Sequence, residues 1–102
     1  MTSPFAKLEQ EISTARDRNC TINGYELVCT CIGCPEQYDV YLNDNRVGYL
    51  RLRHGYFYAS TPDYDGVQVY ESYPEGDGEF TDEERLHYLT NAVQAINEYG
   101  YK

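Results

Sequence analysis

Residues 25–60 read YELVCTCIGCPEQYDVYLNDNRVGYLRLRHGYFYAS, and this stretch decides the fold. Apolar and polar side chains alternate along much of it with a period of two, which is typical of β-strands with one buried face. Residues 43–45 (Asn-Asp-Asn) and 54–55 (His-Gly) interrupt the alternation. Asn, Asp and Gly tolerate the left-handed backbone of tight hairpin turns. The sequence therefore predicts consecutive antiparallel strands joined by short turns.

The same pattern continues on both sides of this stretch, from residue 21 to residue 73. Asn23 and Gly24 form a hairpin signal before the first expected strand, and residues 61–66 (Thr-Pro-Asp-Tyr-Asp-Gly) form a loop before the last. The expected strands of this meander occupy residues 25–30, 38–42, 47–53, 56–60 and 67–73.

Two amphipathic helices are expected to flank the meander. Residues 3–18 begin with a Ser-Pro pair suited to a cap and a first helical position, and their apolar residues recur every three or four positions. Residues 81–100 begin with Thr81, and Glu84 three positions later completes a capping box. Gly100 is a natural helix end.

These elements predict one α+β domain over residues 1–102. A chain of 102 residues is long enough for a single core and too short for two. We expect an N-terminal helix, a four- to five-stranded antiparallel meander sheet and a C-terminal helix, with both helices packed on one face of the sheet.

The charge is unevenly distributed along the chain. There are 17 Asp and Glu against 8 Lys and Arg, which gives a net charge of −9. Residues 55–84 hold the whole excess, because they contain nine acidic residues and no basic ones. An acidic chain is not expected to bind DNA or RNA directly. There is no apolar run long enough for a membrane span and no export signal, so we expect a cytoplasmic protein.

The acidic block predicts a surface for a basic partner. Three of its acids, at residues 82–84, lie where the dipole of the second helix favours negative charge. The other six are interleaved with aromatic residues, and together these can imitate the phosphates and bases of a nucleic acid. The alternative is that the acids only keep the protein soluble. The expected partner-binding residues are Asp63, Tyr64, Asp65, Glu71, Tyr73, Glu75, Asp77 and Glu79.

The chain has four cysteines, three of them in a C-x-C-x-x-C run and the fourth nine residues upstream. Four thiolates are the ligand set of a structural zinc site, and a histidine could replace one of them. The spacing differs from that of two C-x-x-C knuckles, so reduced core cysteines are the alternative. The expected zinc ligands are Cys20, Cys29, Cys31 and Cys34.

Other chemistry has little support in the sequence. Asp63-x-Asp65-Gly66 begins like a calcium loop but lacks the glycine that an EF-hand needs at its sixth position. The chain has no nucleophile-elbow, phosphate-loop or zinc-protease motif. We therefore expect a protein that is not an enzyme.

Residues 25–57, followed by residues 76–85 (GDGEFTDEER), resemble small proteins of gut Firmicutes and their phages. The size and acidity are similar to those of many anti-CRISPR proteins directed at Cas9-type nucleases. This resemblance implies a phage or mobile-element protein that inhibits a host nuclease. In such inhibitors the contact is often the groove whose arginines read the PAM.

Two hypotheses follow from the sequence. The first is an inhibitory binding protein that occupies the basic nucleic-acid-binding groove of a CRISPR nuclease. The second is a small structural or protein-interaction module, zinc-stabilised if the cysteines bind metal, with no inhibitory role. Tyr49, Arg51 and Arg53 share one strand face, and we expect them to pair with the acidic block, either within the chain or in a dimer. An exposed tyrosine face of the sheet would equally serve a homodimer.

Overall fold

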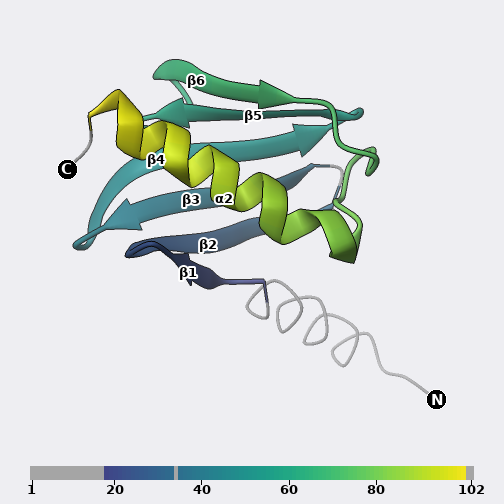
Figure 1. The fold of residues 1–102 in the computed structure, drawn as a ribbon, viewed down its shortest axis with the longest axis horizontal. Coiled ribbons are helices and arrows are strands. Elements are labelled where there is room, and N and C mark those ends of the chain that lie inside the picture. The colour runs from purple at the N-terminus through teal and green to yellow at the C-terminus, as the bar shows by residue number, and fades with distance from the viewer. Residues whose placement is uncertain (1–17, 34, 101–102) are drawn as a thin grey trace.

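The computed structural model describes residues 18–33 and 35–100. They form a six-stranded antiparallel sheet, in which the strands lie side by side in sequence order, and one helix that crosses a single face of the sheet (Figure 1). The elements are β1 (Cys20–Ile22), β2 (Tyr25–Ile32), β3 (Glu36–Leu42), β4 (Asn45–Arg53), β5 (Tyr56–Thr61), β6 (Val67–Ser72) and α2 (Asp82–Tyr99).

The predicted fold class needs correction. The sheet has six strands rather than four or five, because β1 pairs with β2 over three residues. A three-residue segment is too short to show an alternation of apolar and polar side chains, so the sequence pattern missed it. Among the described residues α2 is the single helix, not one of two on the same face. The helix expected over residues 3–18 lies outside the described residues, except for Arg18, which is in a turn.

The three expected hairpin turns are confirmed. Each places two consecutive residues at positive φ, which matches the right-handed twist of the strands that the turn connects. The residues are Asn23 (52°) and Gly24 (87°), Asn43 (52°) and Asp44 (68°), and His54 (54°) and Gly55 (72°). Local sequence therefore sets where each hairpin turns, although the β3–β4 pairing shifts register between Tyr41 and Val40.

The meander gives the sheet two distinct ends. The β2–β3 and β4–β5 turns and residues 73–81 lie at the end where α2 begins, which we call the start end. The β1–β2 and β3–β4 turns and the β5–β6 loop lie at the opposite end, which we call the finish end. Figure 1 shows α2 running back from the start end to the finish end.

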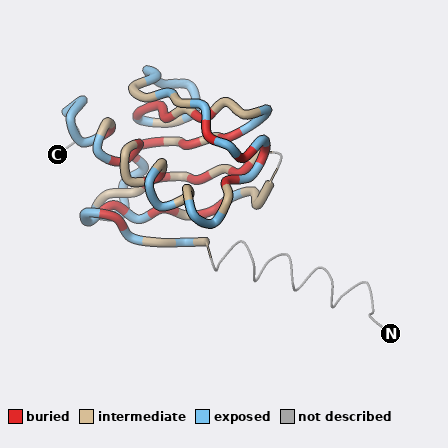
Figure 2. Tube along the Cα trace, turned by 45° about the vertical axis from the view of Figure 1, so that its right-hand side comes forward, coloured by how far each residue is buried: buried red, intermediate tan, exposed pale blue. Residues whose placement is uncertain are grey.

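The core lies between α2 and the face of the sheet beneath it. Buried positions alternate with accessible ones along the strands, as Figure 2 shows. Gly48 allows the helix to lie directly on the backbone of β4, since a Cβ at this position would lie 2.5 Å from Ile96 Cδ1. The helix contributes Leu89, Ala92, Val93 and Ile96, all at most 2% exposed.

A buried carboxylate lies in this apolar core. Glu36 at the start of β3 is fully buried, and its side chain accepts hydrogen bonds from Tyr38 Oη at 2.5 Å and from the Phe80 backbone N–H at 3.0 Å. Arg85 of α2 donates from Nε at 2.9 Å and from Nη2 at 3.3 Å. Arg18 Nη1 lies 3.7 Å from the same carboxylate. Glu36 thus connects β3 to the segment before β1, to the segment before α2 and to α2 itself.

Replacing Glu36 should strongly destabilise the fold. In a Glu36→Ala variant, Arg85 and Arg18 keep partly buried charges that have lost this partner, which costs about 3–5 kcal/mol when a buried pair is broken. Urea unfolding at pH 7 measures the loss. The exposed Glu98 is the matched control, and Glu98→Ala should change the free energy of unfolding by less than about 0.5 kcal/mol. A Glu36→Ala variant as stable as this control would contradict the central role of Glu36.

Candidate functional site

The structure separates the expected partner-binding residues into two groups. Residues 63–65 lie in the β5–β6 loop at the finish end, and residues 73–79 lie at the start end. The six residues of β6 run between the two groups, a distance of about 20 Å at about 3.3 Å per residue. Glu71 lies near the start end of β6, on the face away from α2. The six acids therefore do not form one continuous surface.

Residues 73–80 at the start end alternate strictly between exposed and buried. Phe80 is 3% exposed. The centroid of its ring lies 4.9 Å from that of Phe57 and 5.8 Å from that of Tyr88. Gly76 permits a close turn, since a Cβ there would lie 1.9 Å from the Glu79 carbonyl oxygen. The four exposed side chains, which we call the acidic ridge, belong to Tyr73, Glu75, Asp77 and Glu79.

The backbone of the acidic ridge is held by the first turn of α2. The carboxylate of Glu84 accepts hydrogen bonds from the backbone N–H groups of Glu75 at 2.9 Å, Gly76 at 2.8 Å and Thr81 at 2.9 Å. The Thr81 side chain accepts from the Glu84 N–H, so the predicted capping box is confirmed. On the other side, the Gly55 N–H donates to the Asp77 carbonyl at 2.5 Å. The ridge is therefore preorganised, with its carboxylates pointing outward from a fixed backbone.

The charges on and beside the ridge differ in how far they are neutralised. Glu79 pairs with Arg18, and Asp82 pairs with Arg85 at 2.7 Å. Glu75, Asp77 and Glu83 are exposed and form no ion pair within residues 18–33 and 35–100. These three carboxylates leave a net negative surface at the start end of the sheet.

An open hollow of about 500 Å³ lies beside the ridge. Carboxylates from both the ridge and α2 face it, and Tyr88 contributes an aromatic wall. A Lys or Arg side chain suits such a site, since its stem packs on the ring while its head meets the carboxylates. The lining residues are Glu75, Thr81, Glu83, Glu84, His87 and Tyr88.

The acids at the finish end take part in local structure. Asp63 Oδ1 accepts from the Asp65 N–H at 3.0 Å, and the Asp63 carbonyl accepts from Ser60 Oγ at 2.6 Å and from the Gly66 N–H at 3.0 Å. Tyr64 is 70% exposed, and its ring packs 6.1 Å from Tyr49. Asp63 therefore shapes the loop, and this group offers fewer free carboxylates than the ridge.

The cysteines do not form a metal centre among the described residues. Cys29 is buried, and this burial raises the pKa of its thiol to about 11, which disfavours the thiolate that binds zinc. Burial also raises the pKa of Cys20. Within residues 18–33 and 35–100, no three His, Cys, Asp or Glu side chains come together to hold an ion. Cys34 lies outside the described residues, so the four-cysteine zinc site stays a prediction.

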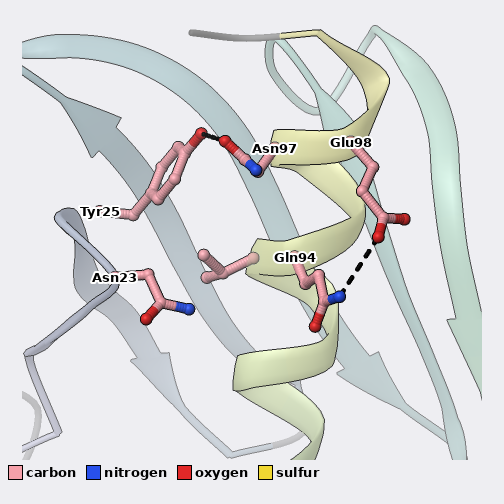
Figure 3. A pocket seen from close by; sticks show the side chains of 6 residues that line it. Asn23, Tyr25, Gln94, Asn97 and Glu98 are labelled. Atoms are coloured by element: carbon pink, nitrogen blue, oxygen red, sulfur yellow. Dashed lines mark hydrogen bonds between the residues drawn. The ribbon is translucent and has the colours of Figure 1, made fainter.

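A second hollow, of about 280 Å³, lies between the β1–β2 turn and the last turns of α2 (Figure 3). Tyr25 Oη donates to Asn97 Oδ1 at 3.0 Å across it, and Gln94 donates to Glu98 at 3.2 Å along the helix. Carboxamides, one phenol and one carboxylate line its polar side. Such groups can hydrogen-bond a small polar molecule, but none of them is placed as a nucleophile beside a base.

Sequence reasoning found the acids of the ridge and the capping box, and it missed the residues that fix the ridge in place. Glu36 lies two residues before Tyr38, on the same buried face of β3. A charged residue in phase with an apolar stripe was the available signal. Arg18 and Arg85, which pair with Glu36, are remote in sequence and gave no signal.

Comparison with known proteins adds no relationship, since no family model, curated protein or solved structure matches the chain. No helix in the described part of the chain is both long and apolar enough to cross a membrane.

The anchoring by Glu84 should make stability depend on pH in the acid range. Burial of its carboxyl opposes ionisation, but the backbone N–H groups of Thr81, Gly76 and Glu75 outweigh this and lower its pKa below the ordinary 4.5. The stabilisation is present above the unfolded pKa and is lost as the pH falls through the lower folded pKa. Glu84→Gln should therefore lower the free energy of unfolding by about 1 kcal/mol at pH 7, which is a typical capping contribution. At pH 3 the stability of the variant should approach that of the wild type.

Urea midpoints at the two pH values measure this difference. Glu83→Gln is the matched control, because the neighbouring Glu83 is exposed and makes no backbone hydrogen bond among the described residues. An equal effect of both substitutions, or a Glu84→Gln deficit that persists at pH 3, would contradict the role given to Glu84.

Proposed function

We propose that this protein is a binding protein whose acidic ridge occupies the basic nucleic-acid-binding groove of a nuclease and so competes with nucleic acid. The target that we propose is a Cas9-type CRISPR nuclease, and the place of action is the cytoplasm of the bacterial host. In this proposal the protein acts by binding rather than by catalysis, and it does not bind nucleic acid itself.

The observation that carries the proposal is the outward projection of Glu75 and Asp77 from an immobilised backbone. The Glu84 carboxylate, which accepts hydrogen bonds from the ridge backbone, and the Gly55 N–H, which donates to it, hold that backbone before any partner arrives. A fixed array of carboxylates loses little conformational entropy on binding, whereas acids on a mobile loop would lose more. Preorganised charge supports partner recognition better than it supports a role in solubility alone.

The chemistry of the ridge fits a groove lined by arginine and lysine. Exposed carboxylates steer association with a basic surface and compete for the side chains that otherwise bind phosphate. The hollow between Glu75 and Glu83 offers a receptor for one such side chain, with Tyr88 as its wall. Tyr73, at the beginning of the ridge, is 73% exposed. Its ring can imitate a nucleic-acid base and stack on aromatic or arginine side chains of the groove.

The choice of nuclease rests on the resemblance of residues 25–57 and 76–85 to small phage-associated proteins. The second of these segments contains Asp77 and Glu79 of the ridge and the first turn of α2. A Cas9-type nuclease binds its guide heteroduplex in a positively charged channel and reads the PAM with arginines. Both surfaces are complementary in charge to the ridge.

Reversing the two unpaired charges of the ridge should abolish inhibition. A Glu75→Lys/Asp77→Lys variant repels the groove, and we expect its inhibition constant to rise at least about a hundredfold, in line with the cost of placing like charges together. The measurement is cleavage of a PAM-containing DNA duplex by the Cas9-type nuclease of a Firmicutes host, with increasing inhibitor. Inhibition by the wild type should weaken as salt rises.

The control carries the same charge change at the finish end. Asp65→Lys/Glu98→Lys has the same net charge as the ridge variant but leaves the ridge intact, so it should inhibit like the wild type. Equal loss in both variants would mean that net charge alone matters and would overturn the ridge assignment. A wild-type protein that leaves cleavage unchanged at every salt concentration would overturn the proposed target.

A further inference from the structure

The face of the sheet opposite α2 carries a continuous aromatic stripe. No element within residues 18–33 and 35–100 covers this face, which we call the open face (Figure 1). Five tyrosine rings follow one another from the β5–β6 loop to the end of β6, with neighbouring centroids 5.5–6.1 Å apart. In order along the stripe they are Tyr64, Tyr49, Tyr58, Tyr56 and Tyr73.

The strand register places a cation, an aromatic ring and an anion in one row across the open face. Arg51 on β4 lies opposite Tyr58 on β5, and Tyr58 lies opposite Glu71 on β6. The Glu71 carboxylate is held in position by Tyr56 Oη at 2.9 Å and by Gln68 Nε2 at 3.2 Å. Arg51 and Glu71 are thus on opposite sides of Tyr58, and neither forms an ion pair with another described residue.

Arg51 has a buried hydrogen-bond donor without a partner in the described chain. This donor is Nε, which is buried among the neighbouring side chains. A buried unsatisfied donor costs about 1–3 kcal/mol. The Arg51 guanidinium also has no ion-pair partner among the described residues, so a carboxylate that meets its head group at the open face would provide one.

We propose that the open face is a two-fold symmetric interface with a second copy of this chain. An interface of this kind needs a self-complementary surface, in which each contact occurs twice. A two-fold axis that lies over β5 and runs along the strands places β4 of one copy over β6 of the other. Arg51 then meets the partner's Glu71, the partner's Arg51 meets Glu71, and the two Tyr58 rings meet at the axis.

The size of the open face fits this occupant. The axis over β5 brings three strands of each copy, β4 to β6, into contact. Three strands at about 4.8 Å each and the nine residues of β4 at about 3.3 Å each span about 14 by 30 Å. This projected area of about 430 Å² is roughened by long side chains, so the accessible area is on the scale of the ~600 Å² that each partner buries at the lower end of stable interfaces. Tyr and Arg are also the residues that contribute most to such interfaces.

A single-stranded nucleic acid fits the same face less well. Tyrosines can stack on bases, but both ends of this stripe are flanked by carboxylates, from Asp65 at one end and from Glu71 and Glu75 at the other. These groups repel a phosphate backbone along its path, whereas in the dimer Glu71 is paired with Arg51. Arg51 and Arg53 on this face can each meet a phosphate, but a polyanion would leave Glu71 beside like charge, whereas a second copy pairs Glu71 with Arg51.

The dimer leaves the ridge carboxylates of Glu75, Asp77 and Glu79 accessible and duplicates them, while Tyr73 lies at the edge of the interface. Because the proposed axis runs along the strands, the start ends of both sheets lie at the same end of the dimer. The two ridges then form one larger acidic surface. The dimer does not depend on the proposed function, since ridge variants should dimerise like the wild type.

Sedimentation equilibrium of the full chain at several concentrations tests the interface. The wild type should be a dimer, and Arg51→Glu or Glu71→Arg should each weaken dimerisation at least about thirtyfold, because each places like charges at both copies of the contact. The double variant Arg51→Glu/Glu71→Arg restores opposite charges and should dimerise again. Recovery in the double variant also shows that the single variants did not merely unfold.

Two further variants complete the test. Glu98→Arg changes the charge on α2, away from the open face, and should leave the mass of the dimer unchanged. Tyr58→Cys should cross-link to itself under oxidation, with the linked peptide identified by mass spectrometry. A wild type that stays monomeric at its highest soluble concentration would overturn the proposal. So would a dimer insensitive to Arg51→Glu, or a monomer whose open face binds a single-stranded oligonucleotide.

Discussion

The carboxylate of Glu36 is the constraint on which the rest of the structure depends. A charge inside an apolar core is strongly unfavourable unless it is paired and hydrogen-bonded. Arg85 and Arg18 provide the pairing, and Tyr38 and the Phe80 N–H complete the hydrogen bonding. Burial and, after it, the hydrogen bond to Glu36 raise the pKa of Tyr38, so this phenol stays a neutral donor. Three segments that are distant in sequence therefore converge on one point at the start end of the sheet.

That convergence explains how an acidic segment can be held so firmly. Phe80 packs in the core beside Glu36, and the Glu84 carboxylate binds the backbone of Glu75 and Gly76. These contacts fix the backbone of the segment so that its acidic side chains face solvent. Acidic residues usually repel one another and loosen a loop. Here the buried Glu36 is paired, while the exposed Glu75, Asp77 and Glu83 form no ion pair within the described residues. The start end thus combines rigidity with net negative charge.

Much of the fold was predictable because its signals are local. The three two-residue turns and the capping box of α2 each depend on a few neighbouring residues with special backbone preferences. β1 was missed because three residues carry no period, and its existence depends on pairing with β2. The acids were found as one block, but β6 separates them, and a sequence block says nothing about which end of a sheet each residue reaches.

The sequence by itself determined the meander, its turns, the final helix and the location of the negative charge along the chain. Those features follow from side-chain period, backbone preference and composition, which are properties of neighbouring residues. Only the tertiary structure decided that Glu36 meets Arg85 and that Arg51, Tyr58 and Glu71 share a row. Such contacts join residues from different strands and from α2, and they exist only once the core has brought these elements together.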